Sequence, residues 1–273
     1  MNRTGLVFEG GGGKGAYHIG VWKALRESGY DKNISVVSGT SVGALNALLF
    51  ANGDYETAEK IWLNISPDSI LKMNAANLLS LGVFLRYNPL ILYQVIVRYF
   101  GRGVFTSDGI KKIIDENIDL LYVSRRDMKI FAGAYNISKA KMEYLTITGR
   151  TPEYIEKAVL ASSALPFVFG PQKLEGSTYI DGGVKDNIPV KPVYDSGVRN
   201  IIVCRLNANK QTDLKGMNDA SVLEIVPEKS QGLIFSGTLD FTPEGSGRRI
   251  SQGYEDTVKI IEKAQKHSSF RLT

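Results

Sequence analysis

The sequence predicts an α/β fold, a three-layer α/β/α sandwich with a mainly parallel central sheet. The first observation is the order of the first fifty residues: strand, glycine loop, helix, strand, tight turn, helix. This alternation is typical of a parallel sheet with helices on its faces. The second observation is that later apolar runs, at 129–136 and 200–205, supply further strands with helical segments between them.

Each expected element rests on a local pattern. Strands are expected where short apolar runs stop at glycine or polar residues, and helices where apolar residues recur every three or four positions. The expected strands are residues 4–9, 34–37, 129–136, 144–148, a run ending at Ile180, and 200–205; the expected helices are 16–28, 44–51, 54–63, 107–116, 152–162 and 252–265. Residues 10–15 are expected to lack regular structure, and 207–218 to form a surface loop.

Composition places the chain among ordinary globular proteins. It has 273 residues, 43% hydrophobic and 22% charged, which excludes disordered and collagen-like classes. One α/β domain over residues 1–273 is expected. No window approaches the ~18–20 apolar residues that cross a bilayer, and the N-terminus lacks the apolar core of a signal peptide. A cytoplasmic location follows, with peripheral membrane contact as one interpretation.

The balance of charge has two interpretations. A formal charge of +5 suits an anionic surface such as a layer of phospholipid headgroups, and it equally suits a charge that only maintains solubility. No long Lys/Arg block is present, so no nucleic-acid partner is expected. With two histidines and the single Cys204, neither a disulfide, a metal nor a cofactor is expected. The oligomeric state is left open.

The pentapeptide Gly39-Thr40-Ser41-Val42-Gly43 fits G-x-S-x-G between an apolar strand and an apolar helix. A serine that attacks an ester must project from a sharp strand-to-helix turn, and Gly39 and Gly43 remove side chains that would clash there. The N–H groups of the following helix favour developing negative charge. Ser41 is therefore the candidate nucleophile; the alternative is a serine that only caps the helix.

The run Gly10-Gly11-Gly12-Gly13-Lys14-Gly15 has three interpretations. A Walker A loop is excluded because two of its required positions differ. A dinucleotide-binding G-x-G-x-x-G is present, but the acidic residue expected after the next strand is missing. The third is an oxyanion hole, in which consecutive N–H groups of Gly10 to Gly13 converge on one point. Lys14 either contacts a lipid phosphate or is simply exposed to solvent.

A serine nucleophile needs a proton acceptor, and three residues are candidates. His18, in the first helix, is expected to be a surface or packing residue, and His267 lies in a polar tail. Asp181 stands where a strand breaks into Gly182 and Gly183, at a strand end where α/β active sites form. A buried carboxylate can act as the base by itself. Asp181 is therefore preferred, although an Asp before Gly also forms ordinary turns.

Three segments together resemble the patatin-like phospholipase family. They are EGGGGKGAYHIGV at 9–21, GTSVGALNALL at 39–49 and YIDGGVKDNIP at 179–189. The match extends to ASSALPFVFGPQ at 161–172 and GVFTSDGIKKII at 103–114, with a weaker similarity at 252–261. The resemblance implies lipid acyl hydrolysis by a Ser41–Asp181 dyad without a catalytic histidine. It also implies an oxyanion hole in the glycine run and structural roles for Asn187 and Pro189.

Two further hypotheses accompany this expectation. The same site could transfer an acyl group to an alcohol, or the glycine loop could belong to a non-catalytic lipid- or nucleotide-binding module. The region at about 64–105 is apolar and basic, with Asp68 as its only acid. It is expected to be helical, forming either a cap that faces a membrane or micelle or helices buried against the sheet.

Overall fold

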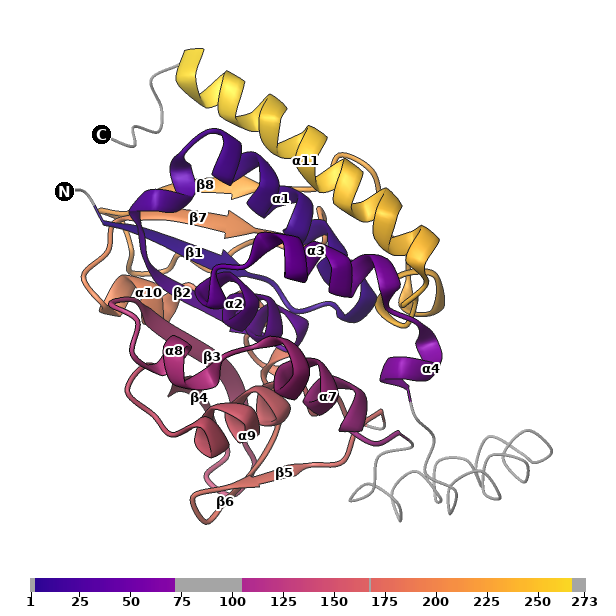
Figure 1. Cartoon of the computed structure of the whole chain (residues 1–273). Helices are drawn as coiled ribbons and strands as arrows, with labels where there is room; N and C mark the ends of the chain where they lie inside the picture. Colours follow the sequence, from indigo (N-terminus) through magenta and orange to yellow (C-terminus); the bar gives the residue numbers. More distant parts are fainter. Residues whose placement is uncertain (1–2, 72–104, 167, 267–273) are drawn as a thin grey trace.

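The computed structural model describes residues 3–71, 105–166 and 168–266, and it contains an 8-stranded mixed sheet in the order β5-β6-β3-β2-β1-β7-β8, with β4 paired to β3 (Figure 1). Strands β3, β2, β1, β7 and β8 are parallel, whereas β4, β5 and β6 pair antiparallel. The strands are β1 Thr4–Phe8, β2 Ile34–Thr40, β3 Lys129–Asn136, β4 Lys141–Thr146, β5 Gln172–Leu174, β6 Ser177–Asp181, β7 Asn200–Cys204 and β8 Ser221–Ile225.

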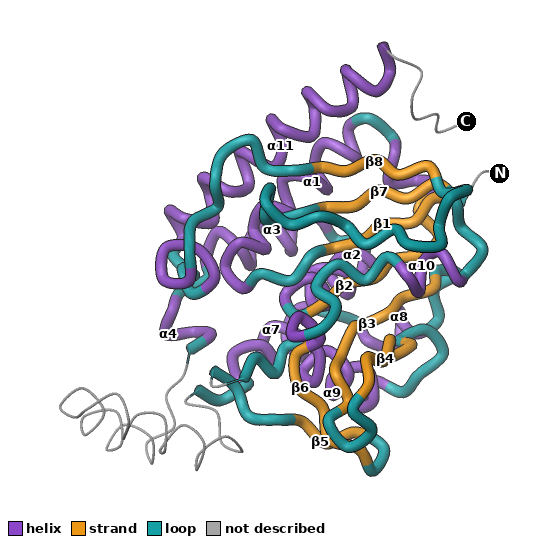
Figure 2. Tube along the Cα trace, turned by 180° about the vertical axis from the view of Figure 1, so that it is seen from behind, coloured by secondary structure: helices purple, strands orange, loops and turns teal. Residues whose placement is uncertain are grey.

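Helices cover both faces of the sheet, so the predicted α/β/α layering is confirmed. Figure 1 shows the larger helical layer, and Figure 2, seen from behind, shows α10 with long loops on the opposite face. The helices are α1 Ala16–Glu27, α2 Val42–Asn52, α3 Tyr55–Asn64, α4 Pro67–Ile70, α7 Asp108–Asn117, α8 Leu120–Ser124, α9 Pro152–Ser162, α10 Lys191–Asp195 and α11 Pro243–Lys266.

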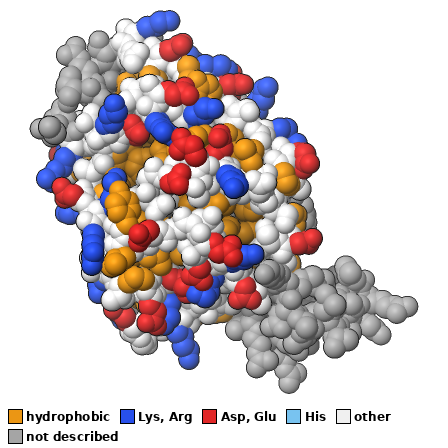
Figure 3. Space-filling view, in the orientation of Figure 1, with side chains coloured by type: hydrophobic (Ala, Val, Ile, Leu, Met, Phe, Trp, Pro, Cys, Tyr) orange, Lys and Arg blue, Asp and Glu red, His pale blue; other side chains and the backbone are white. Residues whose placement is uncertain are grey.

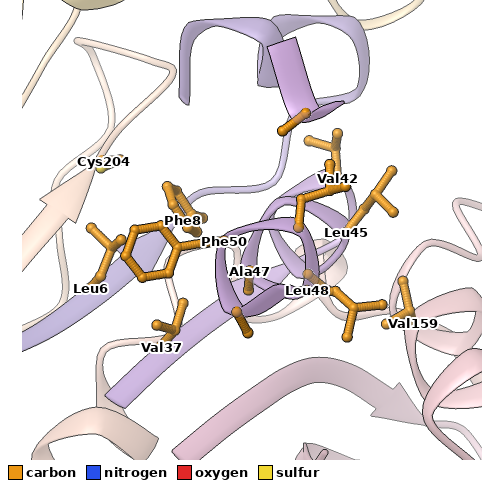
Figure 4. Close-up of a cluster of buried hydrophobic side chains, with 14 of the residues drawn as sticks. Leu6, Phe8, Val37, Val42, Leu45, Ala47, Leu48, Phe50, Val159 and Cys204 are labelled. Carbon is orange, nitrogen blue, oxygen red and sulfur yellow. The ribbon is translucent and has the colours of Figure 1, made fainter. Parts of the chain in front are cut away.

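The sheet separates two hydrophobic cores because neighbouring residues of a strand point to opposite faces. Leu6 and Phe8 of β1 face the larger core, while Val7 faces a smaller core closed by α10. Helix α2 is buried along its whole length except its last residue, which is why its sequence is apolar on every side. Figure 4 shows Val42, Leu45, Ala47, Leu48 and Phe50 of α2 between Leu6, Phe8 and Val37 of the strands and Val159 of α9.

Most of the expected elements are confirmed, and four expectations need correction. Residues 12–15 form one turn of 3-10 helix rather than an irregular loop. Strand β2 continues through Thr40, so the predicted turn contracts to Ser41. Helix α11 begins at Pro243, nine residues before the predicted start. Strand β8 and the short strand β5 were not expected. Most of the predicted cap at about 64–105 lies outside the described residues.

Helices α1 and α11 touch backbone to backbone through glycine. A Cβ on Gly253 of α11 would stand 2.2 Å from the carbonyl oxygen of Tyr17 in α1, whereas a Cβ on Gly247 of the same helix has nothing nearer than 3.8 Å. Gly253→Ala is therefore expected to lower the free energy of unfolding by about 1–3 kcal/mol. Gly247→Ala should raise it by about 0.5–1 kcal/mol through helix propensity. Urea unfolding of both variants checks this, and equal effects would contradict the packing.

Charged side chains of both signs are interspersed over the face seen in Figure 3, with apolar patches between them. The excess of +5 is therefore not gathered into one basic stripe on this face.

Candidate active site

The candidate site lies at the edge of the sheet where β1 and β2 end. The two strands are parallel and in register, with Phe8 opposite Gly39. The glycine loop that follows Phe8 and the turn at Ser41 therefore leave the sheet side by side. The glycine loop and the Ser41 turn are thirty residues apart in the sequence, and the register of β1 with β2 brings them together.

Ser41 has a backbone conformation that a non-glycine residue rarely adopts, with φ 57° and ψ −128°. Such strain costs on the order of 1–3 kcal/mol and is typical of functional turns. Gly39 and Gly43 permit the turn: a Cβ on Gly39 would lie 2.1 Å from the Gly43 carbonyl oxygen, and one on Gly43 would lie 2.3 Å from that of Phe8. Helix α2 begins at the next residue, so its N-terminal N–H groups lie beside Ser41.

Asp181 reaches Ser41 through the pairing of β3. On one side of β3, Thr40 of β2 lies opposite Gly133, and Asp181 of β6 lies opposite the next residue, Ala134. Strand β2 runs parallel to β3 and β6 runs antiparallel to it, so their C-terminal ends converge at this point. Both Ser41 and Asp181 line one pocket. The structure therefore places the two predicted dyad residues together.

The Asp181 side chain is 2% exposed, and the pKa of its carboxyl group is raised. Its Oδ1 accepts a hydrogen bond of 2.7 Å from the Gly183 N–H. Within the described residues no partner with full hydrogen-bond geometry reaches Oδ2. Burial raises the pKa of Asp181 to about 6, while the nearby Ser41 hydroxyl and the Gly183 N–H act in the opposite sense. Asp181 Oδ2 is therefore free to accept a proton, and the carboxyl group changes its protonation state near pH 6.

The start of the glycine loop is fixed by a buried hydrogen-bond network. Glu9 accepts bonds from the backbone N–H groups of Leu206 and Asn207, and from the Asn187 side chain at 3.1 Å. Asn187 also donates to the carbonyl oxygen of Gly10 at 2.8 Å. The predicted structural role of Asn187 thus has a contact that explains it. Glu9, which directly precedes the glycines, was not singled out from the sequence.

The hydrogen bonds of the loop narrow the set of oxyanion donors. The Gly10 N–H donates to the Asn187 carbonyl oxygen at 3.0 Å and is therefore not available to an oxyanion. The expectation that Gly10 is an oxyanion donor is wrong. Gly11 and Gly12 line the pocket with Ser41, whereas Gly13 is buried and does not line it. Gly11 and Gly12 are therefore the better-placed candidates.

Lys14, which directly follows the glycines, lies outside the candidate site. Lys14 does not line the Ser41 pocket; it lines a neighbouring hollow with Leu206 and Ser236. Burial, with nearby Arg249 and Lys210, lowers the pKa of Lys14, while Glu9 raises it.

Gly182 and Gly183 form a short 3-10 turn after Asp181, which orients the carboxyl group through the Gly183 N–H. A Cβ on Gly182 would stand 2.4 Å from the Gly133 carbonyl oxygen. The turn therefore lies directly against β3, which fixes the position of Asp181.

The pocket is mainly apolar. Its apolar walls come from α2, α3, α4, α7 and two loop regions, and they include Val42, Leu45, Ile70, Ile110, Leu165, Val168, Phe169, Leu239 and Phe241. Ile65 and Leu71, at the start of the predicted cap region, also line it. An acyl chain is the kind of ligand that such walls accommodate, with the polar groups gathered at one end.

The histidines do not reach the site where the structure describes them. His18 is completely buried, packs its ring 4.8 Å from that of Phe8 and contacts the Asn46 amide at 3.1 Å. Burial lowers its pKa to about 3. It is a packing residue, as expected, although it is not on the surface. His267 lies outside the described residues.

Ser162 is a site residue that sequence reasoning did not single out. Its hydroxyl accepts a hydrogen bond of 2.9 Å from the Ser41 N–H and donates one of 2.6 Å to the Gly133 carbonyl oxygen. The side chain therefore ties the strained turn to β3. The signal was present, because Ser162 belongs to the ASSALP segment that carried the family resemblance.

Two features are absent from residues 3–71, 105–166 and 168–266. No cluster of three or more His, Cys, Asp or Glu side chains could hold a metal ion there. No helix in the same ranges is both long enough and apolar enough to span a membrane.

The sequence is similar to those of known proteins. The sequence pattern described as patatin-like phospholipase matches residues 6–194. Lysophospholipase NTE1 of Mycosarcoma maydis is 29% identical over 266 residues, which cover 96% of this chain and 12% of that protein. The patatin-like phospholipase domain-containing protein ZK370.4 of Caenorhabditis elegans is 28% identical over 220 residues, covering 80% and 15%.

The chain thus spans less than a sixth of the length of these two relatives. Among solved structures, VipD from Legionella pneumophila has a TM-score of 0.59 at 17% identity, covering 96% of this chain and 67% of that one. That likeness concerns the fold. The family match covers more than half of the sequence, including the glycine loop, the Ser41 turn and the Asp181 turn. The chain belongs to the patatin-like phospholipase family.

Proposed function

We propose that this chain hydrolyses carboxylic esters of lipids, with Ser41 as nucleophile and Asp181 as the general base. The observation that carries the proposal is the pairing of a strained, pocket-facing Ser41 with a buried carboxyl group whose pKa is about 6. A strained serine turn exposes the hydroxyl for attack, and a base with a pKa near the working pH is the more effective proton acceptor.

The proposed reaction has two steps. The Ser41 Oγ attacks the ester carbonyl carbon while Asp181 accepts the hydroxyl proton. The negative charge that develops on the carbonyl oxygen is held by the N–H groups of Gly11 and Gly12, next to the N-terminus of α2. The C–O bond to the alcohol breaks, and the alcohol leaves with the proton. Asp181 then takes a proton from water, whose oxygen attacks the acyl-Ser41 ester. The bond between the acyl carbon and the Ser41 Oγ breaks, Asp181 returns the proton to Oγ, and the fatty acid is released.

The substrate class is proposed from the pocket and the relatives. The apolar walls suit a fatty acyl chain, and proteins named lysophospholipase NTE1 align with most of this chain. A lysophospholipid or phospholipid presented by a micelle or membrane surface is therefore the proposed substrate. No metal or cofactor is required by this mechanism.

Product analysis tests the proposal. The purified chain is incubated with lysophosphatidylcholine micelles and phosphatidylcholine vesicles, and released fatty acid is measured beside Ser41→Ala. Release by the wild type that Ser41→Ala lacks supports the proposal, and equal release by both would contradict it. Added glycerol distinguishes hydrolysis from acyl transfer to an alcohol, because an acyltransferase would form acylglycerol at the expense of free fatty acid.

Replacing Ser162 with alanine is expected to lower kcat by about 10- to 100-fold with a smaller change in KM. The hydroxyl ties the Ser41 N–H to the Gly133 carbonyl oxygen, so its loss loosens the nucleophile turn rather than the pocket walls. Steady-state kinetics on a soluble short-chain ester measure the effect.

Ser124→Ala is the matched control for Ser162→Ala. Ser124 makes a similar hydroxyl-to-carbonyl bond of 2.6 Å, to Arg150, and it does not line the pocket. Its loss should lower stability and leave kcat unchanged. A Ser162→Ala variant with wild-type kcat would show that the bond to Ser41 has no role in catalysis.

A further inference from the structure

Two large apolar side chains are exposed side by side next to the candidate active site. Leu233 and Ile234 are 82% and 63% exposed, the largest exposed fractions among the large hydrophobic residues in the described part of the chain. They stand at the start of a single π-helical turn, Ile234–Thr238. Single exposed apolar residues are ordinary, but an adjacent pair on a protruding turn is typical of a binding surface.

The turn that carries this pair is held firmly by the rest of the protein. Its backbone closes through bonds from the Thr238 N–H to the Leu233 carbonyl oxygen and from the Leu239 N–H to that of Ile234. The Arg249 side chain, 7% exposed, donates to the Ser236 carbonyl oxygen at 3.0 Å and pairs with Asp240 at 2.7 Å. The exposure of the pair is therefore built into an ordered turn.

The same turn continues into the wall of the Ser41 pocket. Thr238 and Leu239 line that pocket, four and five residues after Ile234. The Thr238 carbonyl oxygen is pressed against the glycine loop, since a Cβ on Gly12 would lie 2.1 Å from it. A surface that received Leu233 and Ile234 would therefore lie next to the segment that forms this wall of the Ser41 pocket.

Positive charge accompanies the apolar pair. Lys14 and Lys229 line the hollow that also includes Leu233 and Ile234. Burial lowers the pKa of Lys14, the nearby Glu9 raises it, and the nearby Arg249 and Lys210 lower it further. The acidic neighbour in this hollow, Glu228, is paired with Lys259 at 2.7 Å. Apolar side chains flanked by lysines favour the surface of an anionic lipid layer over a neutral one.

We propose that Leu233 and Ile234 insert into the surface of an anionic phospholipid membrane and place the Ser41 pocket against the lipid layer. This inference rests on the proposed function, because a lipid hydrolase must meet its substrate at such a surface. The binding itself does not depend on catalysis, so it can be measured separately.

The test is sedimentation of the chain with vesicles, using Ser41→Ala so that no lipid is consumed. Vesicles of phosphatidylcholine alone are compared with vesicles that also contain phosphatidylserine. We expect binding to the anionic vesicles that salt weakens, and a loss of about tenfold or more in the double variant Leu233→Ser/Ile234→Ser. The control is Leu121→Ser/Ile137→Ser, two residues with 48% and 44% exposure that line no part of either hollow.

Activity supplies a second readout in the chain with Ser41 intact. The double variant Leu233→Ser/Ile234→Ser, called the tip variant because both residues lie at the exposed tip of the turn, should keep wild-type kcat/KM on a soluble short-chain ester. It should lose activity on phospholipid vesicles. Binding by the tip variant equal to that of the control overturns the proposal, as does equal binding to neutral and anionic vesicles. A wild-type chain that ignores vesicles but forms a dimer lost in the tip variant would assign the tip to a protein interface instead. Absence of all ester hydrolysis, with vesicle binding intact, would refute the proposed function alone.

Discussion

Ser41→Ala is expected to lower ester hydrolysis by about 10⁴-fold or more while the protein stays folded. Removing the nucleophile of a serine hydrolase costs on this scale because the remaining groups cannot form the acyl intermediate. Alanine has no hydroxyl, but its Cβ fits the same backbone position, so the thermal midpoint should change little. Initial rates on a soluble ester, with the background hydrolysis subtracted, measure the loss.

The control for Ser41→Ala is a comparison with Ser124→Ala, which removes a hydroxyl remote from the pocket. That variant should keep wild-type kcat. If Ser41→Ala retained more than about one hundredth of the wild-type rate, Ser41 would not be the nucleophile, since loss of a triad nucleophile costs far more.

Asp181→Asn is expected to lower kcat by about 10³- to 10⁴-fold. An amide accepts the Gly183 N–H as the carboxylate does, so the turn is preserved, but it cannot take the Ser41 proton. Kinetics on the same soluble ester check this expectation. Because His18 is buried with its pKa lowered to about 3, it offers no substitute base near Ser41.

The wild-type pH profile should report the same carboxyl group. Asp181 must be ionised to act as a base, and burial raises its pKa to about 6. The value of kcat/KM should therefore rise with pH, with its midpoint near pH 6, and level off above it. A rate that stays constant from pH 4 to 8 on a soluble ester would contradict the assignment of Asp181 as base.

The raised pKa also has a consequence for stability. The folded state binds the Asp181 proton more tightly than the unfolded state, where the value is near 3.8. The contribution of this group to stability is thus present below pH 4 and is lost as pH rises through 6, by on the order of 3 kcal/mol. Asp181→Asn should therefore melt several degrees above the wild type at pH 8 and at nearly the same temperature at pH 4. A lower melting temperature at pH 8 would contradict the linkage.

Local patterns were sufficient for the elements that position Ser41. Strand β1 is a short apolar run that stops at glycine, and the apolar sequence of α2 marks a helix buried on all sides. The 3-10 turn at 12–15 could not be predicted, because it is imposed by the packing of the 237–240 segment on Gly12 and Gly13. The early start of α11 was missed because Gly245, Ser246 and Gly247 have low helix propensity.

For the candidate site, the sequence identified the main residues but not how they come together. Motifs in the sequence identified Ser41 and Asp181, but their proximity depends on the register of β6 against β3, which no local pattern encodes. The same holds for Ser162, whose hydroxyl is significant only because α9 ends beside Gly133. That the Gly10 N–H is already bonded to Asn187 likewise requires the tertiary structure.

A fluorophosphonate probe tests the central claim most directly, since it bonds covalently to activated serines. The wild type and Asp181→Asn are treated in parallel, and the tryptic peptide 33–60, which contains Ser35, Ser38 and Ser41, is fragmented to locate the adduct. The dyad predicts modification at Ser41 alone, slowed by about 10²-fold or more in Asp181→Asn. Modification at another serine, or equal rates in the two proteins, would contradict it.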